Sequence, residues 1–191
     1  MIEVAEFKKF IDLTLTNYDL AIAQIVAGVN KFVEGYCNNV LLTADVTEYF
    51  NSDDIEEDGE CIYLKTRINV SDVKVYYNHG TEAVPSWVLE ERANYAEQLD
   101  EGRIQLNFAR SVDSIQSGMK NYKVEYKAGF TYANAPADLK LACLKLASAI
   151  FNKRKSEGES SEGLDGANVN FSGSMTDEIK SMLAKYKSFS I

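Results

Sequence analysis

The sequence predicts an α+β protein, with a four-helix core and a mostly antiparallel β insertion between helices two and three. Three observations support this prediction. Apolar residues recur at three- and four-residue spacing near both ends of the chain, which is typical of amphipathic helices. Between residues 40 and 127 the period changes to the two-residue alternation of strands. An apolar content of 46% over 191 residues is enough for one ordinary domain, or for a small core with a sizeable insertion.

Two helices are predicted before residue 40. The first covers 4–11, and the second runs from about residue 18 to 36. Thr16 with Asp19 resembles a capping box, with the shorter acid in place of Glu. Asn38 can adopt the left-handed conformation that ends a helix. The apolar face of the second helix consists of Ile22, Ile25, Val26, Val29, Phe32, Val33 and Tyr36.

Six strands are predicted in the insertion, separated by turn signals such as Asn78-His79-Gly80 and Asp100-Glu101-Gly102. Short strands joined by tight turns indicate an antiparallel sheet or a small barrel. The strands cover 42–50, 61–65, 73–77, 87–90, 104–108 and 122–126.

The stretch from Val124 to Lys155 joins the last strand to the third helix through the turn Ala128-Gly129-Phe130. Pro136 has the backbone angle that suits a helix start, and Asp138 places a negative charge at the positive end of the helix dipole. The apolar stripe of this helix consists of Leu139, Ala142, Cys143, Leu146, Ala149 and Ile150.

The Ser-, Gly- and Glu-rich segment 156–174 is predicted to be a flexible loop. Ser174, with Asp177 three residues later, predicts the cap of a last helix whose apolar side carries Ile179, Met182, Leu183 and Tyr186. The expected organisation is a helical core of residues 1–39 and 128–191 with a β-rich insertion of residues 40–127.

Composition narrows the classes of function. A net charge of −9 should repel nucleic acid over most of the surface. No apolar run approaches the roughly 20 residues that span a bilayer, and no signal-peptide pattern opens the chain, so we expect a protein made in the cytoplasm with no membrane partner. Cys37, Cys61 and Cys143 are far apart and are expected to be reduced, apolar side chains.

Searches for catalytic and metal sites give no candidate, and no cofactor is expected. The acidic stretch 51–60 begins like an EF-hand loop from Asp54, but its twelfth position is Lys65, where a bidentate Glu is needed. His79 is the single histidine and lies in a predicted turn, so it is more readily a turn residue than a base or ligand. The cations Lys153, Arg154 and Lys155 suit a helix C-terminus better than a phosphate site.

The aromatic residues of the insertion allow two interpretations. They could stack on nucleic-acid bases, but such platforms need surrounding cations, and here acids dilute the lysines and arginines. Core or subunit-interface positions are therefore favoured for Trp87, Tyr63, Tyr76, Tyr77 and Tyr95.

The order of these parts resembles the head-tail connector (adaptor) proteins of tailed bacteriophages and gene transfer agents. That family has a strand-turn of the form V.Y.AG(F/Y), a proline before the third helix, an a...La...y..R pattern in that helix and an i..lL..yr closing helix. The matching residues are Val124, Tyr126, Ala128, Gly129, Phe130, Pro136, Leu146, Ala147, Phe151, Arg154, Ile179, Leu183, Tyr186 and Lys187.

The resemblance implies a structural virion protein of the neck without catalysis. Such adaptors form a ring, commonly twelvefold, beneath the portal protein, contact a stopper or tail-completion protein on the other side, and surround passing double-stranded DNA without binding it specifically. The expected portal-contact residues are Arg154, Lys155, Phe171, Met175, Lys185, Tyr186, Lys187, Phe189 and Ile191. The expected channel-lining acids are Asp53, Asp54, Glu56, Glu57 and Asp58.

Two alternatives remain open at this point. The chain could be a neighbouring neck component, namely a stopper or tail-completion protein. It could also be a ligand-binding or enzymatic α+β domain with a pocket around Trp87 or His79.

Overall fold

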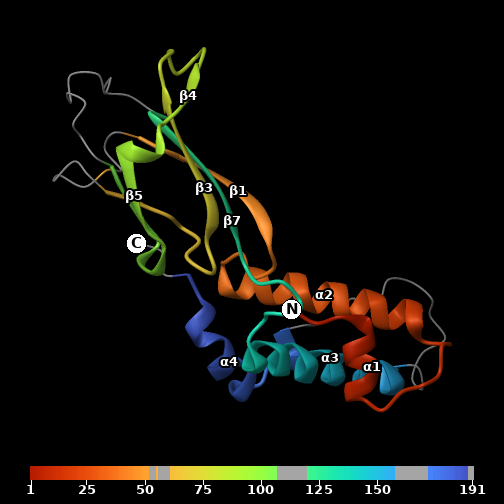
Figure 1. The fold of residues 1–191 in the computed structure, drawn as a ribbon. Coiled ribbons are helices and arrows are strands. Elements are labelled where there is room, and N and C mark those ends of the chain that lie inside the picture. Colours follow the sequence, from red (N-terminus) through yellow and green to blue (C-terminus); the bar gives the residue numbers. More distant parts are fainter. Residues whose placement is uncertain (52–54, 56–60, 107–119, 158–171, 189–191) are drawn as a thin grey trace. The chain divides into compact units, whose positions relative to one another are not determined.

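A computed structural model gives the architecture of the chain (Figure 1). It describes residues 1–51, 55, 61–106, 120–157 and 172–188, and at 154–157 and 172 the backbone alone. The chain divides into two compact units. The helical unit contains Met1–Leu42 and the described residues from Phe130 onward, and the β unit contains the described residues of Thr43–Gly129. Four helices with antiparallel sheets inserted between the second and third confirm the predicted fold class.

The helical unit is built from α1 (Val4–Phe10), α2 (Asp19–Cys37), α3 (Ala137–Glu157) and α4 (Asp177–Leu183), with 3-10 turns η5 (Ser172–Ser174) and η6 (Ala184–Tyr186) on either side of α4. Figure 1 shows α2 and α3 packed side by side. Small residues on α3 allow this close approach, because Ala142 and Ala147 are fully buried. The largest fully buried side chains of the unit are Phe7, Met1, Ile2, Ile22, Leu41, Leu139, Leu146, Leu183 and Val29.

The helix ends agree only in part with the sequence signals. Asn38 takes the left-handed conformation at the end of α2 (φ 48°), as predicted. The predicted cap at Thr16 is wrong, because α2 begins after Tyr18, which makes no side-chain capping bond. The predicted cap at Ser174 is also wrong. Thr176 caps α4 instead by accepting a hydrogen bond from the Ile179 amide at 3.4 Å, because Ser174 lies buried in η5.

Only the two ends of the predicted loop 156–174 fall in the described part of the chain. Its first two residues continue α3 to Glu157, and its last three form η5. Lys153 holds η5 in place by donating to the Gly173 carbonyl at 3.0 Å and to the Ser174 hydroxyl at 3.1 Å. Residues 158–171 lie outside the described part of the chain.

A buried asparagine ties the first residues of the chain to α2. The Asn30 side chain accepts from the Ile2 amide at 3.2 Å and donates to the Ile2 carbonyl at 3.0 Å. Both Ile2 and Asn30 are buried, so these two bonds satisfy backbone groups that water does not reach.

Replacing Asn30 with alanine is expected to lower the free energy of unfolding by about 1–3 kcal/mol, because the buried amide and carbonyl of Ile2 then lack partners. Urea denaturation followed by far-UV circular dichroism measures the change. Gln24→Ala is the matched control, since Gln24 is exposed on the same helix and should change stability by less than about 0.5 kcal/mol. Equal losses in the two variants would contradict the role of Asn30.

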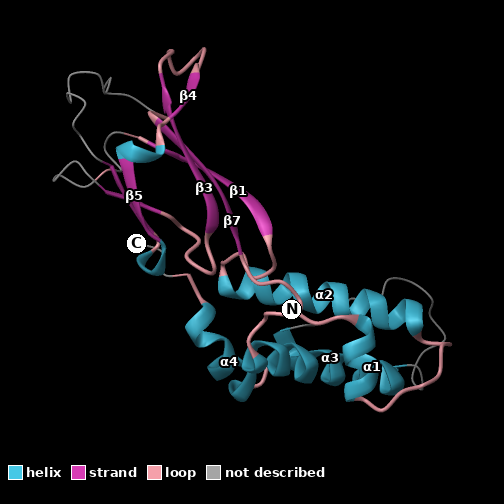
Figure 2. Ribbon diagram, viewed as in Figure 1, coloured by secondary structure: helices cyan, strands magenta, loops and turns pink. Residues whose placement is uncertain are grey.

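The β unit contains two antiparallel sheets (Figure 2). The four-stranded sheet has the order β1 (Ala44–Phe50), β7 (Tyr122–Ala128), β3 (Ser71–Asn78) and β4 (Trp87–Leu89). The three-stranded sheet has the order β2 (Cys61–Tyr63), β6 (Arg103–Leu106) and β5 (Tyr95–Gln98). Strand β5 is not predicted from the sequence; it lies between the 3-10 turns η2 (Arg92–Asn94) and η3 (Leu99–Glu101).

Both sheets contribute one apolar face to the core of the β unit. Along β7, Tyr122, Val124 and Tyr126 are buried, while the residues between them are not. The three-stranded sheet adds Tyr95, Ile104 and Leu106, and the Tyr95 hydroxyl donates to the Val73 carbonyl on β3 at 3.4 Å. The four-stranded sheet therefore has one face in the core and one facing solvent.

A polar cluster is also buried in the β unit. The Tyr126 hydroxyl donates to the Glu48 carboxylate at 2.6 Å, and the other carboxylate oxygen accepts from the Lys65 amide at 3.2 Å. Burial, and then the bond to Glu48, raises the pKa of Tyr126 well above its ordinary value. These bonds join β1 and β7 to the segment that follows β2.

The AGF turn ends the β unit with a backbone conformation that favours glycine. Gly129 has φ 94°, and its amide donates to the Ile68 carbonyl at 2.8 Å. The Asn69 side chain donates to the Gly129 carbonyl at 2.9 Å. This turn fixes the end of β7, and the chain continues into the helical unit at Phe130, whose amide donates to the Leu41 carbonyl at 2.8 Å.

Candidate assembly surfaces

The C-terminal part of the helical unit is attached to the start of α3 through Asp138. The Asp138 carboxylate accepts from the Tyr186 hydroxyl at 2.8 Å and pairs with the Lys185 ammonium at 2.7 Å. The bond to Lys185, and then the Tyr186 hydroxyl, hold the pKa of Asp138 below its usual value. Asp138 therefore binds the last helical turn, η6, in addition to the predicted favourable position at the N-terminal end of α3.

The end of α2 provides a second attachment for the same segment. Asn39 donates to the Tyr186 carbonyl at 3.1 Å, and the Ser188 amide donates to the Cys37 carbonyl at 2.8 Å. The Lys187 ammonium lies 4.0 Å from the centre of the Tyr36 ring, within the range of a cation–π interaction. Residues 184–188 are thus held against two helices by backbone and side-chain contacts.

Replacing Tyr186 with phenylalanine is expected to lower the free energy of unfolding by about 1–2 kcal/mol, because the Asp138 carboxylate loses the hydroxyl that donates to it. Burial, and then the bond to Asp138, raises the pKa of Tyr186 to about 12 from its ordinary 10. The stability that comes from this shift is present below pH 10 and is lost as the pH rises from 10 to about 12.

Urea denaturation at pH 8 and pH 11 tests both statements, and Tyr132→Phe is the control because Tyr132 is an exposed tyrosine of the same unit. Tyr186→Phe should lose less stability than the parent chain between these pH values. An unchanged pH dependence would show that Tyr186 does not carry the effect.

The structure places the predicted portal-contact residues in different environments. Lys185 and Lys187 are exposed on η6 and directly after it. Met175 and Tyr186 are buried within the helical unit. Arg154 and Lys155 lie in the last turns of α3, where the structure describes the backbone alone. The remaining candidates, Phe171, Phe189 and Ile191, lie outside the described residues.

The predicted channel-lining acids also lie outside the described part of the chain. This holds for Asp53, Asp54, Glu56, Glu57 and Asp58. Within the described ranges, no group of three His, Cys, Asp or Glu side chains is arranged to hold a metal ion. None of the helices found there has both the length and the apolar content needed to cross a bilayer.

The solvent side of the four-stranded sheet carries a second candidate surface, which we call the aromatic sheet face and define by Tyr49, Tyr76, Trp87, Leu89 and Lys123. Cross-strand pairing places Tyr49 opposite Lys123, Lys123 opposite Tyr76, and Tyr76 opposite Leu89, so one row crosses all four strands. Trp87 joins this row through its ring, which lies 5.7 Å from the Tyr49 ring.

The aromatic sheet face is held together by its own contacts. The Lys123 ammonium lies 3.9 Å from the centre of the Tyr76 ring and 5.6 Å from that of Trp87. Glu125 pairs with Lys123 at 2.7 Å and accepts from the Tyr76 hydroxyl at 3.0 Å. Tyr49 and Leu89 remain about half exposed, at 49% and 54%.

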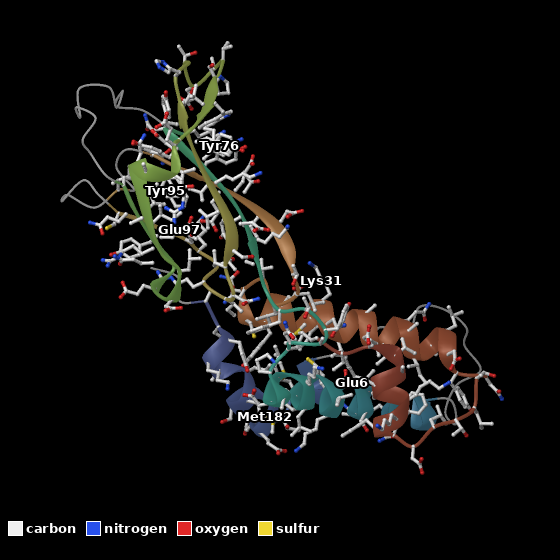
Figure 3. All side chains as sticks on the ribbon, in the orientation of Figure 1. Glu6, Lys31, Tyr76, Tyr95, Glu97 and Met182 are labelled. Atoms are coloured by element: carbon white, nitrogen blue, oxygen red, sulfur yellow. The ribbon has the colours of Figure 1, made fainter. Side chains whose placement is uncertain are left out.

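The structure divides the five aromatic residues that the sequence singles out. Tyr76 and Trp87 belong to the aromatic sheet face, whereas Tyr95 is buried on β5. Figure 3 labels Tyr76 and Tyr95 on their separate strands. Sequence reasoning misses Tyr49, Leu89 and Lys123. The alternation within β1, β4 and β7 identifies their outward positions, but only the strand order brings them into one row.

The ligand-binding alternative expects a pocket around Trp87 or His79, and neither residue lines the hollow found in the described part of the β unit. His79 is exposed in the turn between β3 and β4, and Trp87 lies on the open sheet face. A polar hollow in this unit is lined instead by Arg92 and residues 97–101. Arg92 is already paired there with Glu97 at 3.3 Å.

A family model described as "Head completion protein" matches residues 1–189, so the chain belongs to the head completion protein family. This finding confirms the resemblance seen in the sequence. It also confirms the prediction of a structural protein rather than an enzyme, because head completion is a structural role.

Solved structures of gene transfer agent (GTA) particles contain chains of similar fold. A chain of "Virion of native gene transfer agent (GTA) particle" has a TM-score of 0.65 and 16% identity, covering 100% of this chain and 91% of that chain. A chain of "Neck of empty GTA particle computed with C6 symmetry" has a TM-score of 0.61 and 14% identity, with the same coverage. A chain of "Neck of native GTA particle computed with C12 symmetry" has a TM-score of 0.56 and 16% identity, covering 98% and 89%. A search of curated proteins gives no match.

Proposed function

We propose that this protein is the head-tail adaptor in the neck of a tailed phage or gene transfer agent particle. Copies form a ring beneath the portal protein and join it to the next neck or tail component, a stopper or tail-completion protein, around the DNA channel. The observation that carries the proposal is membership of the head completion family over residues 1–189. The full-length likeness in fold to chains from GTA virions and necks supports it.

The number of copies in the proposed ring is twelve. One fold relative comes from a neck computed with C12 symmetry, which supports this number. The acidic balance of the chain, −9, suits a ring around DNA, because like charges repel phosphates and let the duplex pass without binding. In this proposal the acids between Asp53 and Asp58 line the channel.

The portal contact is assigned to the C-terminal segment and the end of α3. Tyr186 is buried and bound to Asp138, so it fixes the segment from which Lys185 and Lys187 project. Met175 packs at the start of α4 and supports the same segment. Arg154, Lys155, Phe171, Phe189 and Ile191 complete the proposed contact.

Gradient sedimentation of the purified chain mixed with its cognate portal tests the proposal, followed by negative-stain imaging of the comigrating fraction. We expect a ring on one end of the portal, and reduced comigration for Lys185→Glu with Lys187→Glu. Binding to the tail component without binding to the portal would place the chain one layer lower. A chain that associates with neither would refute the neck assignment.

A further inference from the structure

The aromatic sheet face is unusual for a solvated surface. The outer face of an antiparallel sheet commonly carries polar residues, yet here two tyrosines, a tryptophan and a leucine lie next to one another. Tyr and Trp are enriched in protein–protein interfaces and among the residues that dominate their binding energy. We propose that the aromatic sheet face binds a second copy of this chain through an acidic part of that copy's surface; this assignment rests on the proposed ring.

The face is organised before any partner binds. Lys123 lies between Tyr76 and Trp87, with its side chain only 14% exposed, and Glu125 bonds to both Lys123 and Tyr76. Tyr49 is held by the Trp87 ring and by the Lys120 ammonium, which lies 5.5 Å from the centre of the Tyr49 ring. Side chains that are already fixed lose little conformational entropy on binding, so a partner gains more from contacting them.

The balance of lysines and carboxylates around the aromatic sheet face favours an acidic partner surface. On this side, the four-stranded sheet and the residues just before β7 carry four lysines and three carboxylates. Two of those carboxylates are already paired, Glu125 with Lys123 and Asp72 with Lys127 at 2.8 Å. Lys74 and Lys120 are exposed beside them. The lysines are Lys74, Lys120, Lys123 and Lys127, and the carboxylates are Asp45, Asp72 and Glu125.

The rest of the chain is acidic, because the whole carries −9. Asp100 and Glu101 lie exposed on η3 in the same β unit, where Glu101 also pairs with Arg103 at 3.2 Å. A surface of this kind on one copy complements the lysine-flanked aromatic face of another. Two different surfaces then meet head to tail, which is the type of contact that closes a ring.

Isotope-resolved cross-linking tests the contact directly. Unlabelled and ¹⁵N-labelled chains are mixed, treated with a zero-length carbodiimide and analysed by mass spectrometry, so that mixed-isotope pairs report links between copies. We expect Lys74 and Lys120 to form such links with carboxylates of the other copy, far above Lys31, which is 87% exposed on α2. Links that favour Lys31, or no links at about 1 mM chain, would overturn the proposal.

Variants give the second measurement, with sedimentation equilibrium as the readout. Tyr49→Ser with Leu89→Ser should weaken self-association at least about tenfold, because both side chains are half exposed in the monomer and would be covered in the contact. Leu20→Ser and Val84→Ser are matched controls, since these apolar side chains are exposed at 77% and 73% outside the aromatic face. Lys120→Glu keeps the folded monomer and should weaken association most at low salt. Equal effects in the control and test variants would refute the face as the contact.

The outcomes separate this inference from the adaptor function. A chain that forms rings on the portal but cross-links through other lysines refutes the role of the aromatic sheet face and leaves the adaptor function intact. A chain that self-associates through this face but never comigrates with portal supports the contact and refutes the adaptor function.

Discussion

Replacing Phe7 with alanine is expected to lower the free energy of unfolding of the helical unit by about 3–5 kcal/mol. Phe7 is the one buried residue of α1 and is fully covered, and its ring packs edge-on against Phe151 of α3 at 6.1 Å. A helix of seven residues has little stability of its own, so its place in the unit depends on this side chain. Removing the ring leaves a cavity and frees α1 from α3.

Phe10→Ala is the matched control, because Phe10 belongs to the same helix but is 45% exposed. It should change stability by less than about 0.5 kcal/mol. Circular dichroism at 222 nm follows the helices during urea denaturation. Fluorescence of the single tryptophan, Trp87 on β4, follows the β unit separately. Similar losses for Phe7→Ala and Phe10→Ala would contradict the anchoring role of Phe7.

Alkaline pH is expected to destabilise the helical unit through two buried thiols. Burial raises the pKa of Cys37 to about 11 and that of Cys143 to about 12, from an ordinary value of 9. In the unfolded chain both thiols ionise above pH 9, whereas the folded chain keeps them protonated. The stabilising effect is therefore complete below pH 9 and is lost as the pH rises toward 11 and 12. By pH 11, each thiol accounts for a loss of on the order of 2 kcal/mol in the free energy of unfolding.

The test compares urea denaturation at pH 8 and pH 11 under reducing conditions. Between these two pH values, the free energy of unfolding should fall by on the order of 4 kcal/mol less in the double variant Cys37→Ala with Cys143→Ala than in the parent chain. Cys61→Ala serves as the control, because Cys61 is a half-buried thiol in the β unit. The change with pH is the decisive quantity, since removing side chains from the core also lowers stability at every pH. An unaltered pH dependence in the double variant would exclude the thiols as its source.

Local signals account for the parts of the fold that the sequence predicts well. Pro136 precedes the first turn of α3 because it fixes its own backbone angle, and Asn38 ends α2 because it tolerates the left-handed conformation. The two wrong caps, Thr16 and Ser174, have a different origin. Each was expected to cap its helix, but α2 begins after Tyr18 without a side-chain cap, and the hydroxyl of Thr176 lies where the Ile179 amide can reach it.

Strand β5 and the aromatic sheet face depend on pairing between distant segments. The sequence Tyr95-Ala-Glu-Gln98 has weak strand character, and it becomes a strand because it pairs with β6. Tyr76 and Tyr77 are neighbours in the sequence, yet alternation along β3 sends them to opposite faces, and the register with β7 places Tyr76 beside Lys123. The order β1-β7-β3-β4 also brings together residues that are far apart in the chain, such as Tyr49 and Trp87, which are 38 positions apart.

The first and last residues of the β unit lie next to each other. Leu42 and Phe130 form a parallel bridge, and the Thr43 hydroxyl donates to the Gly129 carbonyl at 3.5 Å, so the β unit begins and ends at adjacent points. Lengthening a segment whose ends are already together is inexpensive in chain entropy, at about 0.6 kcal/mol for each doubling. The β unit can therefore be lengthened, shortened or exchanged with little loss in the folding free energy of the helices that precede and follow it. During synthesis, α3 leaves the ribosome only after the whole β unit. The contact between α2 and α3 therefore forms only after the β unit has been synthesised.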